Sequence, residues 1–215
     1  MVAIARPLMN DPKDPTHVTY MWGQKIIDYA LAHGVNVLDI RDPWIEYGKI
    51  TPILQNNPPD LFVYTGHGCR NYLATQNGCS LTNGYAEDVC AAQCASKCNL
   101  KALRDSIIVT FSCHSASQLG RCAVKYGARA YVGFSDYMMF TTDSMNSQDM
   151  FRDALLPMVF ELINGKTVGE AVASTKQALI ADAKKFKFIK YIAIPMYWNF
   201  EYMQMFGDMN ARLGG

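Results

Sequence analysis

Residues 107–115 read Ile-Ile-Val-Thr-Phe-Ser-Cys-His-Ser, an apolar, β-branched run that ends abruptly in a polar cluster around a cysteine. Residues 61–68 repeat the pattern as Leu-Phe-Val-Tyr-Thr-Gly-His-Gly. Short apolar runs bounded by polar residues and glycine are typical of buried strands. Each predicted strand carries one reactive side chain just beyond its carboxyl end. Because ligands bind at that edge of parallel sheets, the pattern predicts a Cys/His site along one sheet edge.

Strands and helices alternate along the rest of the chain. Apolar runs predict further strands at 2–5, 35–40 and 129–134, and apolar residues at helical spacing predict helices at 20–31, 45–54, 116–125, 148–163 and 168–185. This order predicts an α/β fold whose mainly parallel central sheet is flanked by helices. We expect a single domain over residues 1–215. It carries a Cys-rich insertion at about 69–103, in which residues 86–97 favour a helix.

Composition and charge exclude several classes of protein. The 215 residues suit one domain, and 50% hydrophobic with 18% charged residues is a globular composition. A formal charge of +1 gives no reason to expect nucleic acid or an anionic membrane as partner. The apolar runs are shorter than the roughly 18 residues of a membrane span, and residues 1–6 lack the features of a signal peptide. We therefore expect a cytoplasmic protein, and the oligomeric state stays open.

Cys113 and His67 are the candidate catalytic residues. A cysteine attacks as its thiolate, so it needs a lowered pKa or a nearby base. The helix expected near Ala116 would favour a negative sulfur through its dipole, and His67 is placed to act as base and then acid. The backbone N–H groups of Gly68 and Cys113 form the expected oxyanion hole. Alone, either side chain is better interpreted as structural, but their pairing at two strand ends favours catalysis.

Residues 64–68 and 112–115 resemble the two active-site motifs of the caspase-like cysteine peptidases. That group includes caspases, metacaspases, clostripain, gingipains, legumain and separase. The motif Ser-Cys-His-Ser is most similar to metacaspases, whereas residues 127–133, 165–171 and 206–208 are more similar to gingipain and to CHAT domains. The resemblance implies a three-layer caspase-like fold, a Cys–His dyad and cleavage of peptide or protein substrates.

The resemblance also bears on cofactors and activation. It implies that no cofactor is required, and it allows activation by calcium or by self-cleavage, as in many relatives. Lys97, Lys101 and Arg104 near the insertion are hypothetical cleavage points. Because hydrolysis and transpeptidation share one acyl-enzyme, the sequence leaves both outcomes open.

The residues that would bind the substrate are less well defined. Metacaspases and clostripain carry an acidic residue two places before the nucleophile, where this chain has Phe111. Asp136, after the next strand, is a candidate for pairing with an Arg or Lys side chain at P1, with a loop or capping role as the alternative. Asp39, at the end of an earlier strand, is a second candidate, and Asp143 is a weaker one.

The cysteines of the insertion suggest a metal site only weakly. Cys90, Cys94 and Cys98 are spaced four apart, so they would form one stripe on a helix. Cys69 or Cys79 would complete a four-sulfur zinc site, but no Cys-x-x-Cys pair is present. Disulfides or reduced thiols are therefore preferred over zinc.

Two rival functions follow from these features. A non-catalytic caspase-like module could serve interaction or signalling, although the intact Cys–His pair argues against it. Alternatively, the cysteine cluster at 69–98 could make the chain a metal- or redox-sensing protein.

Overall fold

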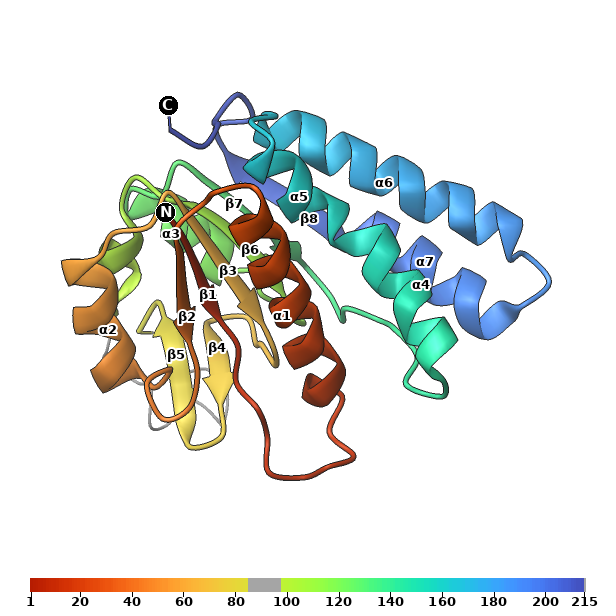
Figure 1. Ribbon diagram of the computed structural model, residues 1–215, viewed down its shortest axis with the longest axis horizontal. Coiled ribbons are helices and arrows are strands. Elements are labelled where there is room, and N and C mark those ends of the chain that lie inside the picture. The colour runs from red at the N-terminus through yellow and green to blue at the C-terminus, as the bar shows by residue number, and fades with distance from the viewer. Residues whose placement is uncertain (85–97, 215) are drawn as a thin grey trace.

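The computed structural model describes residues 1–84 and 98–214. Six strands form one sheet in the order β2-β1-β3-β6-β7-β8 (Figure 1). The first five strands of this order run parallel, and β8 is antiparallel to β7. The strands are β1 (Val2–Ala5), β2 (Val37–Ile40), β3 (Leu61–Thr65), β6 (Ile107–Phe111), β7 (Ala130–Phe134) and β8 (Met203–Gly207). The mainly parallel sheet predicted from the sequence is confirmed.

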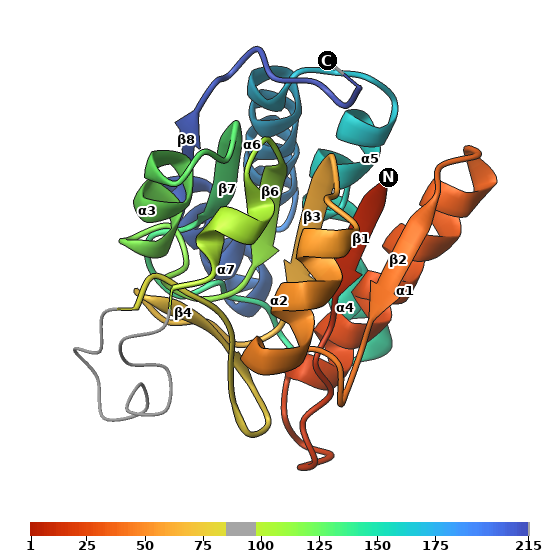
Figure 2. The ribbon, with the colours of Figure 1, turned by 90° about the vertical axis from the view of Figure 1, so that its left-hand side faces the viewer.

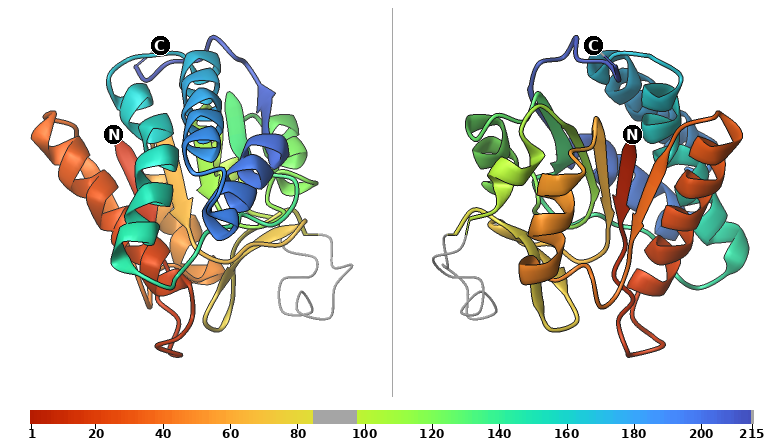
Figure 3. Two further views of the ribbon diagram at one scale, coloured as in Figure 1. Left: turned by 90° about the vertical axis from the view of Figure 1, so that its right-hand side faces the viewer. Right: turned by 60° about the vertical axis from the view of Figure 1, so that its left-hand side comes forward.

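Helices cover both faces of this sheet and complete three layers (Figure 3). One face packs against α1 (Thr16–Ala32), α4 (Met145–Leu155), α5 (Pro157–Ile163), α6 (Val168–Lys185) and α7 (Lys190–Tyr202). The other face packs against α2 (Tyr47–Asn56), α3 (Leu119–Lys125) and the short 3₁₀ helix η2 (Leu100–Leu103) (Figure 2). In the part of the chain that the structure describes, no helix is both long and apolar enough to span a membrane.

The two central strands explain why their sequences read as continuous apolar runs. Every residue of β3 and of β6 is buried. On β3, Leu61 and Val63 join the core beneath α1, whereas Phe62 and Tyr64 join the core beneath α2. A strand covered on both faces loses the alternation of apolar and polar residues. The packing therefore accounts directly for the pattern at 61–65 and 107–111.

The pairing of β3 with β6 fixes where their ends lie. The strands are parallel neighbours with Leu61 opposite Ile107 and Thr65 opposite Phe111. The strands end at this last pair, and the chain continues to His67 on one side and to Cys113 on the other. The adjacency expected from the sequence is confirmed, and it delivers both residues to the same edge of the sheet.

The insertion after β3 is partly described. Its first half is an antiparallel hairpin of β4 (Tyr72–Thr75) and β5 (Gly78–Thr82), which lies below the carboxyl edge of the sheet in Figure 1. The helix predicted at 86–97 lies outside the described residues.

Two helix predictions were wrong in their extent. The helix after Cys113 begins at Leu119 rather than near Ala116, because residues 112–118 form turns. The helix expected at 148–163 is divided into α4 and α5. Pro157 has no N–H to continue the first helix, and it occupies the first turn of the second.

We predict that Gly133→Ala destabilises the fold. A Cβ at Gly133 would lie 2.5 Å from Thr110 Oγ1 and 2.6 Å from Ser115 Oγ, two hydroxyls that bond to each other beneath the turn at Cys113. Overpacking of this kind costs roughly 1–3 kcal/mol. Urea denaturation measures the loss. Gly48→Ala is the matched control, because no atom lies within 4 Å of its added Cβ, and its stability should be unchanged or slightly raised. Equal midpoints for Gly133→Ala and wild type would contradict this packing.

Candidate active site

His67 is held at the sheet edge by its backbone. Its carbonyl accepts a hydrogen bond from the Ala74 N–H at 3.0 Å, which ties the turn to β4. The Tyr64 hydroxyl lies 3.0 Å from the same carbonyl. The Gly66 N–H donates to the Phe111 carbonyl at 3.2 Å, so the pairing of β3 with β6 continues into the turn. The imidazole is therefore carried on a backbone fixed from several directions.

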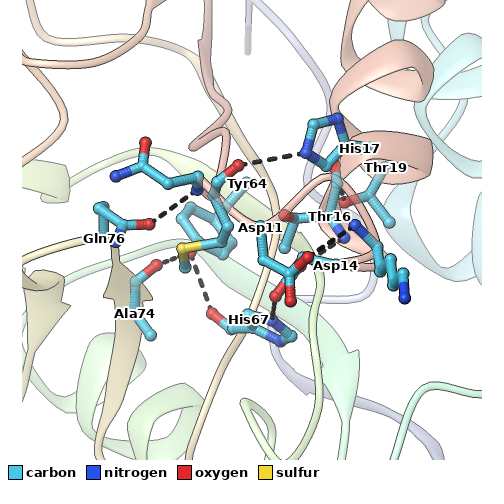
Figure 4. Close-up of polar contacts among 12 residues, drawn as sticks. Asp11, Asp14, Thr16, His17, Thr19, Tyr64, His67, Ala74 and Gln76 are labelled. Carbon is cyan, nitrogen blue, oxygen red and sulfur yellow. Dashed lines mark hydrogen bonds and ion pairs between the residues drawn. The ribbon is translucent and has the colours of Figure 1, made fainter.

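Asp14 is the partner of the His67 imidazole, and sequence reasoning missed it. Nε2 of His67 lies 2.9 Å from Oδ2 of Asp14 (Figure 4). The other carboxylate oxygen accepts the Thr16 N–H at 2.8 Å, at the start of α1. Burial acts to raise the pKa of the Asp14 carboxyl, but Thr16 and His67 outweigh burial, so this pKa lies below its ordinary value. Asp14 thus presents a carboxylate to the imidazole at neutral pH.

A signal for Asp14 does exist in the sequence. The loop that contains it follows β1, and β1 lies directly beside β3. Loops after parallel neighbours emerge at the same edge of a sheet, and ligands bind where the strand order reverses. In the order β2-β1-β3-β6-β7, that reversal falls between β1 and β3. A carboxylate just before the first helix was therefore a candidate. However, the sequence alone does not show that β1 lies beside β3.

Cys113 lies in a turn that hydrogen bonds hold to β6 and β7. The Ser115 hydroxyl lies 2.8 Å from Oγ1 of Thr110 and donates to the Ser112 carbonyl at 3.1 Å. The Ala116 N–H donates to the Phe134 carbonyl at 2.9 Å, which ties the turn to β7. His114 has a φ of 54° and packs edge-on against Tyr137, and its structural role stays a prediction. These bonds fix the direction in which the cysteine leaves β6.

The thiol of Cys113 is not activated by a helix dipole. Because α3 begins at Leu119, its first turn lies beyond Cys113, and the field of a helix dipole falls off within a turn. Burial is the main cause that raises the pKa of the Cys113 thiol above its ordinary value, with Cys69 and Asp136 adding to it. Between His67 and Cys113, both within the described residues, no hydrogen bond forms. The resting cysteine is therefore a neutral thiol.

Gly68 touches the backbone of Cys113. A Cβ at this position would lie 2.8 Å from the Cys113 carbonyl oxygen and 2.9 Å from Cβ of Ser112, so only glycine fits without a shift. The N–H groups of Gly68 and Cys113 make no hydrogen bond to any residue in 1–84 or 98–214. The two residues that carry the predicted oxyanion donors are thus in contact, and neither N–H bonds to another described residue.

A small pocket of about 80 Å³ opens between the two reactive residues. It is lined by Pro15, Thr16, Thr19, Gly66, His67, Ser112, Cys113, Met138 and Phe140. The lining comes from α1, from the turns after β3 and β6, and from the segment after β7. The pocket therefore joins His67 and Cys113 in one site.

Asp136 and Asp39, the predicted substrate-binding residues, make other contacts. The Asp136 carboxylate accepts the Tyr137 N–H at 2.7 Å and lies 4.0 Å from Nδ1 of His114. Arg6 donates to both carboxylate oxygens of Asp39, at 2.8 and 2.7 Å, and Arg41 adds a third contact at 3.2 Å. Neither aspartate lines the pocket. Their roles in substrate binding stay predictions, but both have structural partners.

Only part of the cysteine cluster at 69–98 lies within the described residues. Cys90 and Cys94 lie outside the described residues, and Cys98 is an exposed free thiol. Cys79 takes part in a disulfide bond, so its sulfur is not a thiolate for zinc. The described residues contain no group of three or more metal-binding side chains.

The fold and the site define an α/β protein with a caspase-like sheet and a Cys–His pair at its carboxyl edge. The family model of peptidase family C25 matches residues 32–214, and the chain belongs to that family. No protein among the curated sequences matches it.

Solved structures share the fold. The Arg-specific cysteine proteinase gingipain R matches with a TM-score of 0.62 and 13% identity, over 99% of this chain and 46% of that one. The complex of Porphyromonas gingivalis RgpB pro- and mature domains matches with a TM-score of 0.61 and 14% identity, over 99% and 48%. A structure described as a protease matches with a TM-score of 0.57 and 16% identity, over 98% and 48%. This chain spans about half the length of the structures it matches.

We predict that alkylation of Cys113 rises steeply with pH. Because burial raises the pKa of the thiol, the reactive thiolate is scarce at neutral pH. The rate with iodoacetamide should grow about tenfold per pH unit and still rise above pH 9. Peptide mass spectrometry resolves this site from Cys98, an exposed thiol that serves as internal control. A rate for Cys113 that is flat between about pH 6 and 8 would contradict a neutral resting thiol.

Proposed function

We propose that this chain is a cysteine endopeptidase that uses Cys113 as nucleophile and His67 as base. One observation carries the proposal: both residues line the same pocket, beside two backbone N–H groups that have no other described partner. Membership of peptidase family C25 supports the same reaction class and implies peptide or protein substrates.

The reaction follows from the atoms in the site. Sγ of Cys113 attacks the scissile carbonyl carbon, and the thiol proton passes to His67. The N–H groups of Gly68 and Cys113 stabilise the oxyanion that forms. The C–N bond then breaks as His67 returns the proton to the leaving amine. Water attacks the thioester, which releases the acid and restores the thiol.

Asp14 determines which imidazole nitrogen of His67 acts as the base. A carboxylate 2.9 Å from Nε2 accepts a hydrogen bond from the N–H of that nitrogen, so Nδ1 keeps its lone pair. Nδ1 is then the base for the thiol of Cys113. When the imidazole gains the proton, the charge on Asp14 stabilises the imidazolium. Because the resting thiol is neutral, proton transfer accompanies attack instead of preceding it.

Several finer expectations stay predictions. A basic P1 residue requires a carboxylate that reaches the substrate, and the partners of Asp136 and Asp39 do not favour this. Calcium activation rests on the resemblance alone. The disulfide at Cys79 argues against a cytoplasmic location, because disulfides are typical of oxidising compartments.

The proposal is tested by proteolysis of an unfolded protein such as reduced casein. Wild type should cleave it, whereas Cys113→Ala and His67→Ala should lose at least about a thousandfold in rate. Circular dichroism checks that both variants fold. Equal cleavage by wild type and Cys113→Ala would overturn the proposal, and a folded wild type that cleaves nothing would favour the non-catalytic module.

We predict that Asp14→Asn lowers kcat by about a hundredfold or more. An amide can donate to Nε2, which places the imidazole proton on Nδ1 and removes the base. Peptide turnover measures the loss, and little change in KM is expected. Asp11→Asn is the matched control, since Asp11 lies in the same loop and contacts the Lys13 N–H rather than His67. Equal kcat for Asp14→Asn and Asp11→Asn would show that Asp14 does not orient the imidazole.

A further inference from the structure

A group of large apolar side chains is exposed where α6 is followed by α7. The group, called the α7 tip below, consists of Phe188, Ile189, Tyr191, Ile194 and Tyr197. Phe188 is 88% exposed, so its ring lies almost entirely in water. Tyr191, Ile194 and Tyr197 follow one another at every third residue of the helix, which places them side by side on its outer surface. Large apolar side chains that gather on a surface mark an interaction site.

Lysines lie before and within the α7 tip along the chain, and all of them are exposed: Lys184, Lys185, Lys187 and Lys190. None of these ammonium groups forms an ion pair within residues 1–84 or 98–214. Asp182 is the single carboxylate among residues 182–190, so this segment is strongly basic. The formal charge of +1 for the whole chain hides this local excess of positive charge.

The backbone of the α7 tip is fixed by hydrogen bonds and by packing. The Ile189 N–H donates to the Phe186 carbonyl at 2.7 Å, and the Ile192 N–H donates to the Ile189 carbonyl at 2.9 Å. The side chain of Ile192 is buried in the core on the inner side of α7. Lys187 holds its ammonium nitrogen 4.9 Å from the centroid of the Phe188 ring. Apolar and basic groups are therefore presented together on one ordered segment.

The α7 tip and the reactive pair occupy separate parts of the surface. In Figure 1 the loop between α6 and α7 forms the right-hand end of the molecule, beyond the sheet. His67 and Cys113 instead follow the carboxyl ends of β3 and β6. A partner bound at the tip therefore has no direct contact with the two reactive side chains.

We propose that the α7 tip docks this protein on an anionic membrane surface. Phe188 and Ile189 enter the boundary between headgroups and acyl chains, and the lysines bind the phosphates of the headgroups above them. Nucleic acid would pair with the lysines but leave the apolar side chains in water. A bilayer surface places an anionic layer directly over an apolar one, and the tip matches both. The contact is peripheral, and it does not depend on the proposed peptidase function.

Cosedimentation of the full chain with lipid vesicles tests the proposal. Vesicles of equal parts phosphatidylglycerol and phosphatidylcholine should bind the protein at least about tenfold more tightly than phosphatidylcholine alone, because each lysine near an anionic surface adds attraction. Added NaCl should weaken this binding by screening the charges. No binding to the anionic vesicles, or equal binding to both kinds, would overturn the inference.

Variants assign the binding to apolar and basic groups of the tip. Phe188→Ala should weaken binding to the anionic vesicles about tenfold, because the ring no longer leaves water on binding. Trp44→Ala is the matched control, since Trp44 is also exposed, at 58%, but lies in the turn after β2. Circular dichroism checks that both variants fold. Equal binding by both would show that Phe188 does not enter the membrane.

The charge is tested in the same way. The double variant Lys187→Gln with Lys190→Gln should weaken binding at least about tenfold. Lys25→Gln with Lys125→Gln is the control, because both lysines are exposed and lie on α1 and α3. Equal loss in the two double variants would reduce the effect to overall charge and contradict a docking site at the tip.

A depth measurement separates insertion from contact with another protein. In Phe188→Trp, brominated phosphatidylcholine mixed into the anionic vesicles should quench the fluorescence more strongly than in wild type, because the new indole lies among the lipids. Equal quenching would contradict insertion. A dimer in light scattering that Phe188→Ala abolishes, together with no vesicle binding, would overturn the inference and assign the tip to a second copy of this chain.

Discussion

The register between β3 and β6 is the constraint on which the site depends. Thr65 lies opposite Phe111, so the turns that follow leave the sheet side by side. Gly68 then approaches the backbone of Ser112 and Cys113 so closely that no side chain fits between them. A slip of one residue would reverse the faces of the strand that slips and separate the turns. The buried side chains of β3 and β6 therefore fix the geometry of the reactive pair as well as the core.

Asp14 links the fold to the chemistry through one side chain. One of its oxygens accepts the N–H of Thr16 where α1 begins, and the other faces the imidazole of His67. Helix α1 packs on the core through Trp22 and Ile26. The carboxylate lies in the loop before α1 and is anchored by the first backbone N–H of that helix, as an orienting group requires.

Much of this arrangement could be predicted from the sequence. The apolar runs at 61–65 and 107–111 give the strands, and their polar endings give His67 and Cys113. Helix α6 was predicted with its bounds at 168–185, where Thr167 and Glu170 form a capping box. What could not be predicted depends on distant partners. Asp39 looked like a free strand-end carboxylate, but Arg6 occupies it. The burial that raises the pKa of the Cys113 thiol arises only when separate elements pack together.

A crystal structure of the chain with a peptide aldehyde tests the central claim most directly, because the hemithioacetal mimics the tetrahedral intermediate. The account predicts a bond from Sγ of Cys113 to the aldehyde carbon. It also predicts that the new oxygen lies within hydrogen-bonding distance of the N–H groups of Gly68 and Cys113, with His67 still bonded to Asp14. An aldehyde bound to another cysteine, or an oxygen directed away from both N–H groups, would contradict it.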